Sequence, residues 1–258
     1  MKNLIYLLTL LSCTLFAQEK VEVTCSIPPM QWLAEQIGGD EIVAKSLLPK
    51  SADPHTFALT PGQLKSIKTA QLVLACGSLD FESKLLKIRP DLLSSTPEFK
   101  IENEHVWLST DFLKVMAKKL TIKLTEERST EKAYFEANLK IFLDRADDLE
   151  TEVESTVKRL KQKHFYSYHG VFYYLAKQYG LQETNIQVEK RTPSPRELLT
   201  IIKVAKRDAI RVIFMQEQFN ERPAKMIAQR TGASIVKMNP LDEDCFKTIS
   251  NAVKALDK

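Results

Sequence analysis

The sequence predicts an α/β fold of two lobes, each a small parallel sheet flanked by helices, joined by one long rigid helix. Short apolar runs alternate with helical patterns in the first half of the chain, and the same alternation returns in the second half. Between them lies a long amphipathic stretch that neither glycine nor proline interrupts. Strand–helix alternation is typical of parallel sheets covered by helices. We therefore expect an N-terminal lobe at 18–128, a connecting helix at 129–163 and a C-terminal lobe at 164–258.

The expected first lobe contains apolar runs of strand length separated by helical patterns. The expected strands are VEVTCSI (21–27), EIVAKSLL (41–48) and QLVLACG (71–77). The expected helices are PMQWLAEQIGG (29–39), which ends at a glycine pair, TPGQLKSIKTA (60–70), and a helix that begins at Ser109 or Thr110. Pro61 fits the first turn of its helix, where its missing N–H has no partner to lose.

The connecting stretch carries an apolar stripe at spacings of three and four residues, which is the pattern of one continuous helix face. The stripe consists of Phe135, Leu139, Phe142, Ala146, Leu149, Val153, Val157 and Leu160. A helix of about 33 residues would be roughly 50 Å long. Two interpretations are open here: a coiled-coil helix that joins copies of the chain, or a rod packed along both lobes.

The expected second lobe repeats the alternation. Its expected strands are HFYSY (164–168), TNIQVE (184–189), IRVIFMQ (210–216) and ASIVKM (233–238). Its expected helices are GVFYYLAKQYG (170–180), SPRELLTIIKVAKRDA (194–209) and DCFKTISNAVKALD (244–257).

The composition argues against several classes of protein. The net charge is +4 from 37 basic and 33 acidic residues, without a basic run, so a nucleic-acid partner is not expected. The chain has no G-x-G-x-x-G sequence and no Walker loop, which argues against the usual nucleotide sites.

The N-terminus resembles an export signal. Lys2 precedes an apolar run at 4–16 that is too short to cross a bilayer, and we expect a signal peptide at 1–17 with cleavage near Ala17. A second interpretation takes Cys13 as a lipid-anchored N-terminus, although the residues after it continue the apolar run. Either interpretation places the mature chain outside the cytoplasm, and we expect a periplasmic protein.

Two of the cysteines end strand-like runs. Cys25 closes VEVTC and Cys76 closes QLVLAC, so the pair could form a disulfide if the strands are neighbours. The alternative is that both are buried apolar thiols. Both interpretations stay open, because cysteine connectivity does not follow from sequence.

The chain has four histidines, and His55, His105 and His169 lie at or near the ends of elements where ligands gather in parallel sheets. His164 begins its strand and so belongs at the opposite end. Neutral imidazole is the commonest metal ligand in proteins. We also expect His169, at the start of a helix, to be held neutral by the helix dipole.

A fourth donor would close a tetrahedral site. The acids of the loop NPLDEDCF (Asp242, Glu243 and Asp244) are candidates, although Asp244 would equally cap the final helix. Gln216 would be a weak ligand, and Glu217 would support a ligand.

Several pieces of the chain resemble the zinc or manganese solute-binding proteins of bacterial metal-uptake ABC transporters, and they come in that family's order. The pieces are DPHTFALTPGQLKSIKTAQLVLACG, HVWLS, HGVFYYLAKQYGL, FMQEQF and TGASIVKMNPL. The resemblance implies two lobes, a rigid connecting helix and a metal in the cleft between the lobes. The implied ligands are His55, His105, His169 and Asp244. Three nitrogen donors favour Zn²⁺, with Mn²⁺ and Fe²⁺ as alternatives.

The chain departs from the family pattern at three places. Gln216 stands where the family commonly has glutamate, and NEH (103–105) stands where it commonly has DPH. The histidine-rich loop of many zinc members is absent, because 82–104 contains no histidine.

The resemblance implies a non-enzymatic carrier that captures a divalent metal, Zn²⁺ above all, and delivers it to a membrane permease. We expect a monomer. One alternative is a zinc-dependent hydrolase or lyase with a water at an open fourth position. The other is an exported adhesin or structural protein.

Overall fold

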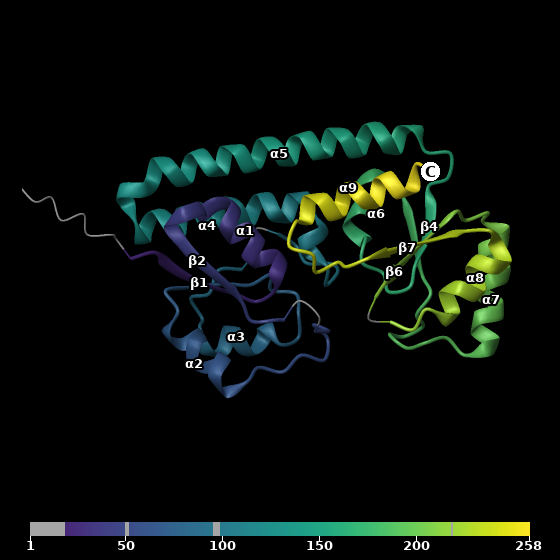
Figure 1. The fold of residues 1–258 in the computed structure, drawn as a ribbon, viewed down its shortest axis with the longest axis horizontal. Coiled ribbons are helices and arrows are strands. Elements are labelled where there is room, and N and C mark those ends of the chain that lie inside the picture. Colours follow the sequence, from purple (N-terminus) through teal and green to yellow (C-terminus); the bar gives the residue numbers. More distant parts are fainter. Residues whose placement is uncertain (1–18, 50–51, 95–98, 218) are drawn as a thin grey trace, which may run out of the picture.

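The computed structural model describes residues 19–49, 52–94, 99–217 and 219–258, and it contains two parallel sheets in an α/β arrangement (Figure 1). The long helix α5, Lys132–Arg159, runs along one side of the molecule above both sheets. The predicted fold class is therefore confirmed. The expected lobe boundaries stay predictions. The expected signal peptide and the Cys13 anchor lie outside the described residues.

The first sheet has the strand order β2-β1-β3. Its strands are β1 Val21–Cys25, β2 Ile42–Ser46 and β3 Leu72–Leu74. Val21 pairs with Ile42, and Val23 pairs with Leu72. The alternating buried residues of β1 place one face of the sheet against α1, Pro28–Gly38.

The second sheet has the order β5-β4-β6-β7. Its strands are β4 His164–Ser167, β5 Gln182–Asn185, β6 Val212–Gln216 and β7 Ser234–Met238. All five residues of β6 are buried, as in a central strand covered on both faces. Strand β5 begins two residues earlier than expected, and its ladder continues to Gln187, whose N–H donates to the carbonyl of Tyr168.

The remaining helices connect the strands. They are α2 Pro61–Thr69, α3 Glu82–Ile88, α4 Thr110–Glu127, α6 Tyr173–Tyr179, α7 Pro195–Arg207, α8 Arg222–Thr231 and α9 Cys245–Leu256. Capping boxes start α2, at Thr60 with Gln63, and α7, at Ser194 with Glu197. Gly180 ends α6 in the left-handed conformation that glycine adopts at low cost.

Helix α5 packs along α1, α4 and α9 of the same chain. It is 28 residues long, shorter than predicted, because a 3-10 turn at Ser129–Glu131 precedes it and Leu160 ends it. The predicted stripe is buried except for the partly buried Leu139. The burial of the stripe within one chain agrees with the packed-rod interpretation.

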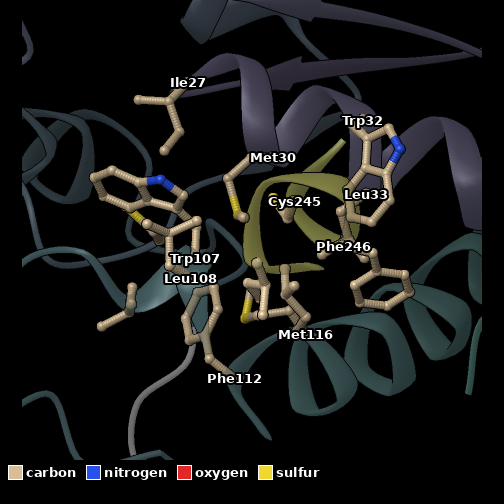
Figure 2. Packing of buried hydrophobic residues seen from close by; sticks show 14 of the residues in the cluster. Ile27, Met30, Trp32, Leu33, Trp107, Leu108, Phe112, Met116, Cys245 and Phe246 are labelled. Atoms are coloured by element: carbon tan, nitrogen blue, oxygen red, sulfur yellow. The ribbon is translucent and has the colours of Figure 1, made fainter. Parts of the chain in front are cut away.

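The last helix, α9, packs against helices that come much earlier in the chain. Figure 2 shows Cys245 and Phe246 of α9 among residues of α1 and α4. The Phe246 ring centroid lies 5.2 Å from that of Trp32 on α1 and 4.9 Å from that of Phe142 on α5. One hydrophobic cluster therefore continues from the first sheet to Phe165 and Phe214 of the second sheet.

The cysteines of the described residues are free and buried. Cys25 and Cys76 do not form a disulfide, so the buried-thiol interpretation holds. The Cys76 thiol donates to the buried carboxylate of Glu82, with Sγ 3.1 Å from Oε1. Among the described residues, none of the helices combines the length and the apolar character of a membrane-spanning segment.

Candidate metal centre

Three imidazoles and one carboxylate converge between the two sheets. His55, Glu104, His105 and His169 each offer one ligand atom, and these atoms all lie within 4.8 Å of one another. The ring centroid of His169 lies 5.1 Å from that of His55 and 5.0 Å from that of His105. His55 lies in the loop after β2, and Glu104 and His105 lie in the loop between α3 and the 3-10 turn Val106–Leu108, whereas His169 follows β4 of the second sheet. The structure thus brings together residues 114 positions apart, from 55 to 169.

His105 is buried and held by the asparagine before it. Its ring is at the start of the 3-10 turn Val106–Leu108, and the residue is 2% exposed. Asn103 Oδ1 lies 2.9 Å from the His105 backbone nitrogen and 3.1 Å from its Nδ1. Because an amide oxygen only accepts hydrogen bonds, Nδ1 carries the proton and Nε2 keeps its lone pair. Burial, with His169, His55 and Lys190 nearby, holds the pKa of His105 well below its ordinary value.

His169 is held in the same way from the second sheet. Its Nδ1 lies 2.9 Å from Oε1 of Gln187, so Nε2 again keeps the lone pair. Gln216 Nε2 donates to the His169 carbonyl at 2.9 Å. The Nε2 atom of His169 is buried and has no hydrogen-bond partner among the described residues. An orphaned buried nitrogen that faces two other imidazoles fits a cation at this position.

The pKa of His169 is lowered mainly by burial, with His55 and Lys190 adding to the effect. The expected helix-dipole effect does not apply, because α6 begins only at Tyr173 and His169 lies in the loop before it. A buried carboxylate fixes that loop instead. Glu183 Oε1 accepts the N–H groups of Val171 and Phe172, at 3.1 and 3.2 Å.

Gly170 lies next to His169, where the loop passes close to β5. A Cβ atom at this position would meet the side-chain amide of Asn185, which would have to move aside.

Glu104 supplies the carboxylate of the group. Its Oε2 lies 3.5 Å from His55 Nδ1, and its Oε1 lies 3.8 Å from His169 Nε2. The His55 N–H donates to Asp53 Oδ1 at 3.0 Å, which shapes the turn that presents the His55 ring. Apolar side chains of Trp107, Phe219 and Leu241 line the rest of the pocket. Such walls exclude water and strengthen electrostatic interactions inside the pocket.

The structure places the other predicted residues elsewhere. Asp244 lies outside the group, and its Oδ1 accepts the Lys247 N–H at 3.0 Å as the cap of α9. Asp242 and Glu243 are exposed in the same loop, and Glu217 is exposed after β6. Gln216 is fully buried and supports the His169 carbonyl. His164 contacts Thr184 and Asp208 at the far end of β4.

Sequence reasoning missed Glu104. The available signal was its position in NEH, directly before a predicted ligand, where the chain departs from the pattern of the family that it resembles. A carboxylate next to a ligand in the same loop is a candidate donor. The position of Asp244, by contrast, is explained equally well by its role as the N-cap of the final helix.

Comparison with known proteins identifies relatives over nearly the whole chain. The high-affinity zinc uptake system protein ZnuA of Bacillus subtilis is 26% identical over 87% of this chain and 79% of its own length. The manganese ABC transporter substrate-binding lipoprotein PsaA of Streptococcus mitis is 23% identical over 84% of this chain and 79% of its own. A crystal structure of ZnuA is 28% identical with a TM-score of 0.84, covering 93% of this chain and 98% of that one.

The family described as zinc-uptake complex component A, periplasmic, matches residues 23–257. Its members are solute-binding proteins of transporters and not enzymes, which argues against the hydrolase or lyase alternative. The match spans both sheets, the long helix and every residue of the candidate metal centre. The chain therefore belongs to the family of periplasmic zinc-uptake components, the metal-binding substrate-binding proteins of ABC uptake systems.

Proposed function

We propose that this protein captures Zn²⁺ outside the cytoplasm and delivers it to the permease of an ABC transporter. The proposed ligands are His55, His105, His169 and Glu104. The observation that carries the proposal is the convergence of these four donor atoms within 4.8 Å of one another.

The donor set favours zinc over manganese. Zn²⁺ takes four ligands in a tetrahedron and accepts imidazole nitrogen readily, whereas Mn²⁺ prefers oxygen donors. Two of the imidazoles have their Nδ1 atoms engaged by amide oxygens, which leaves Nε2 for the metal. The amide partners also fix the ring orientations, so little reorganisation precedes binding.

The ligands come from both sides of the cleft, which suggests how the metal is released. A cation held by His55, Glu104 and His105 on one side and His169 on the other joins the two sheets. A small movement of one side would stretch the bonds to His169 and weaken all of the coordination. Helix α5 and the continuous core limit that movement to a slight tilt.

The first experiment replaces His169 by glutamine and uses His164→Gln as the matched control. His164 is a partly buried histidine of the same sheet whose Nε2 contacts Thr184 at 2.9 Å, away from the centre. We expect His169→Gln to lose at least a hundredfold in zinc affinity in a competitive chelator titration, and His164→Gln to bind as the wild type does. Wild-type protein that binds neither Zn²⁺ nor Mn²⁺ would reject the proposal, and tighter binding of Mn²⁺ would reject its zinc assignment.

The second experiment decides which acid is the fourth donor. Glu104→Gln removes the carboxylate of the centre, and Asp244→Asn removes the other candidate while keeping a good helix cap. We expect zinc affinity to fall by at least about tenfold for Glu104→Gln, because removal of groups that only support the ligands already costs that much, and to stay unchanged for Asp244→Asn. The reverse result would restore Asp244 as the ligand.

A further inference from the structure

A tight turn presents a lysine to the metal centre. Val188 and Arg191 exchange two backbone hydrogen bonds of 3.0 Å, and Glu189 and Lys190 form the two-residue turn between them. Both turn residues have positive φ, 50° and 62°, in a region that residues other than glycine rarely adopt. The turn directly follows Gln187, which holds His169. Residues other than glycine that adopt such a strained conformation beside a functional site often position a side chain for that site.

The turn directs Lys190 across the cleft to Glu104. The Lys190 ammonium nitrogen lies 3.2 Å from Glu104 Oε2. The same oxygen lies 3.5 Å from His55 Nδ1, and the other lies 3.8 Å from His169 Nε2. The Lys190 side chain is 66% exposed, whereas that of Glu104 is 23% exposed. One carboxylate is therefore shared between the inward-facing imidazoles and a lysine at the outer edge of the centre.

The charge of Lys190 reaches the imidazoles as well. It contributes to the lowered pKa values of His105 and His169, in the direction expected when a positive charge opposes a second one. A divalent cation at the centre would meet the same repulsion, and with twice the charge. Glu104 would also have to exchange its ammonium partner for the metal.

We propose that Lys190 is a built-in competitor of the metal: its ammonium group pairs with Glu104, is displaced when the cation binds, and re-forms the pair as the cation leaves. This inference rests on the proposed function of the centre. Its consequence is that the affinity is set below the maximum that the donor set allows. Such a competitor helps a carrier that must pass its metal to a partner. When the cation leaves, Lys190 pairs with Glu104, so the carboxylate is not left without a partner.

The test compares Lys190→Gln with a matched lysine. Lys177 on α6 also pairs with an acid of the opposite side, Glu102, which lies in the same loop as Glu104 but outside the centre. We expect Lys190→Gln to bind Zn²⁺ about twofold to fivefold tighter and release it correspondingly more slowly, as for a partly exposed charge pair. Lys177→Gln should bind as the wild type does, and the charge-preserving Lys190→Arg should keep most of the competition and so show a smaller gain than Lys190→Gln. If Lys190 competes with the metal, Lys190→Gln gains zinc affinity. If Lys190 only supports the structure of the site, the same variant loses affinity.

Two further measurements complete the test. In a Glu104→Gln background, Lys190→Gln should lose most of its effect, because the pair no longer exists. The gain should also shrink at 1 M salt, where screening reduces the repulsion between exposed charges. Unchanged or weaker zinc binding by Lys190→Gln, while the wild type binds zinc, would overturn this inference alone. Wild-type protein without metal binding would overturn the proposed function and this inference with it.

Discussion

His105 and His169, two of the proposed ligands, are oriented by amide side chains that lie outside the candidate metal centre. Asn103 and Gln187 accept the Nδ1 protons, and burial disfavours protonation of either ring. A lowered imidazole pKa means that the neutral, metal-binding form persists to lower pH than in an ordinary histidine. The two amide residues lie in different loops, Asn103 between α3 and the 3-10 turn Val106–Leu108 and Gln187 after β5, yet each accepts a hydrogen bond from a histidine Nδ1.

The pH dependence of zinc binding follows from these pKa directions. The imidazoles must be neutral to bind. Because the pKa values of His105 and His169 lie below that of an ordinary histidine, about 6.5, affinity should stay nearly constant down to that pH and fall only at lower pH, where protons compete with the metal. Competitive titrations in steps from neutral pH down to about pH 4 measure this. Affinity that stays constant over the whole range would contradict ligation by imidazoles.

The stability of the metal-free protein should also decrease as the pH falls. His105 has a lower pKa folded than unfolded, so the unfolded chain binds more protons as the pH falls below about 6.5. Its contribution to stability is present above that pH and is lost progressively in acid.

Among the elements, α5 has the largest structural role. Its buried stripe packs on α1, α4 and α9, and its outer face carries charged pairs such as Lys140 with Asp144. Phe142 of this helix meets Trp32 at 5.7 Å and Phe246 at 4.9 Å between ring centroids. The helix therefore fixes the first and last helices of the described chain to each other.

Two neighbouring residues of α5 separate the buried face from the exposed one. Phe142 is 1% exposed and Ile141 is 58% exposed. We expect Phe142→Ala to lower the free energy of unfolding by about 3–5 kcal/mol, through the lost burial and the cavity left behind. Ile141→Ala should change it by less than about 0.5 kcal/mol. Urea unfolding measures both, and a large loss for Ile141→Ala would show that the outer face is covered in solution, as a coiled-coil partner would cover it.

At the scale of the whole molecule, one hydrophobic cluster extends from the first sheet to Phe165 and Phe214 of the second, while Tyr166 and Ile213 of the second sheet pack in a separate cluster with α7 and α8. The proposed ligands come from both sides of the cleft. The core and α5 keep the two sides close to their binding geometry without a metal. Metal binding would then add stability to a fold that already exists, unlike a small domain that folds only around its metal.

Zinc should raise the unfolding temperature of the whole chain in one transition. At a free concentration about 1,000 times the dissociation constant, binding adds about 4 kcal/mol, which corresponds to roughly 10 °C for a chain of this size. Scanning calorimetry with and without Zn²⁺ measures the shift, with His169→Gln as the variant that should lose it. Two separate transitions, only one of them sensitive to zinc, would show that the metal does not join the two sides.

The sequence by itself determined the alternation of strands and helices, because apolar periodicity and helix caps act over a few residues. It predicted the α5 stripe, the start of α4 at Ser109 or Thr110, and the first turn of α2 at Pro61, from preferences that act within one or two turns. It also singled out His55, His105 and His169, because parallel strands bring their carboxyl ends to one edge.

Only the tertiary structure decided which acid joins the histidines and what the cysteines do. Glu104 and Asp244 are both loop acids next to helices, and their difference lies in distances across the cleft that no local pattern encodes. The start of α6 after His169 was likewise set by Glu183 on the adjacent strand, because its carboxylate holds the loop before the helix. Local preferences act between near neighbours in the sequence, whereas a metal centre depends on the packing of segments that are far apart in the chain.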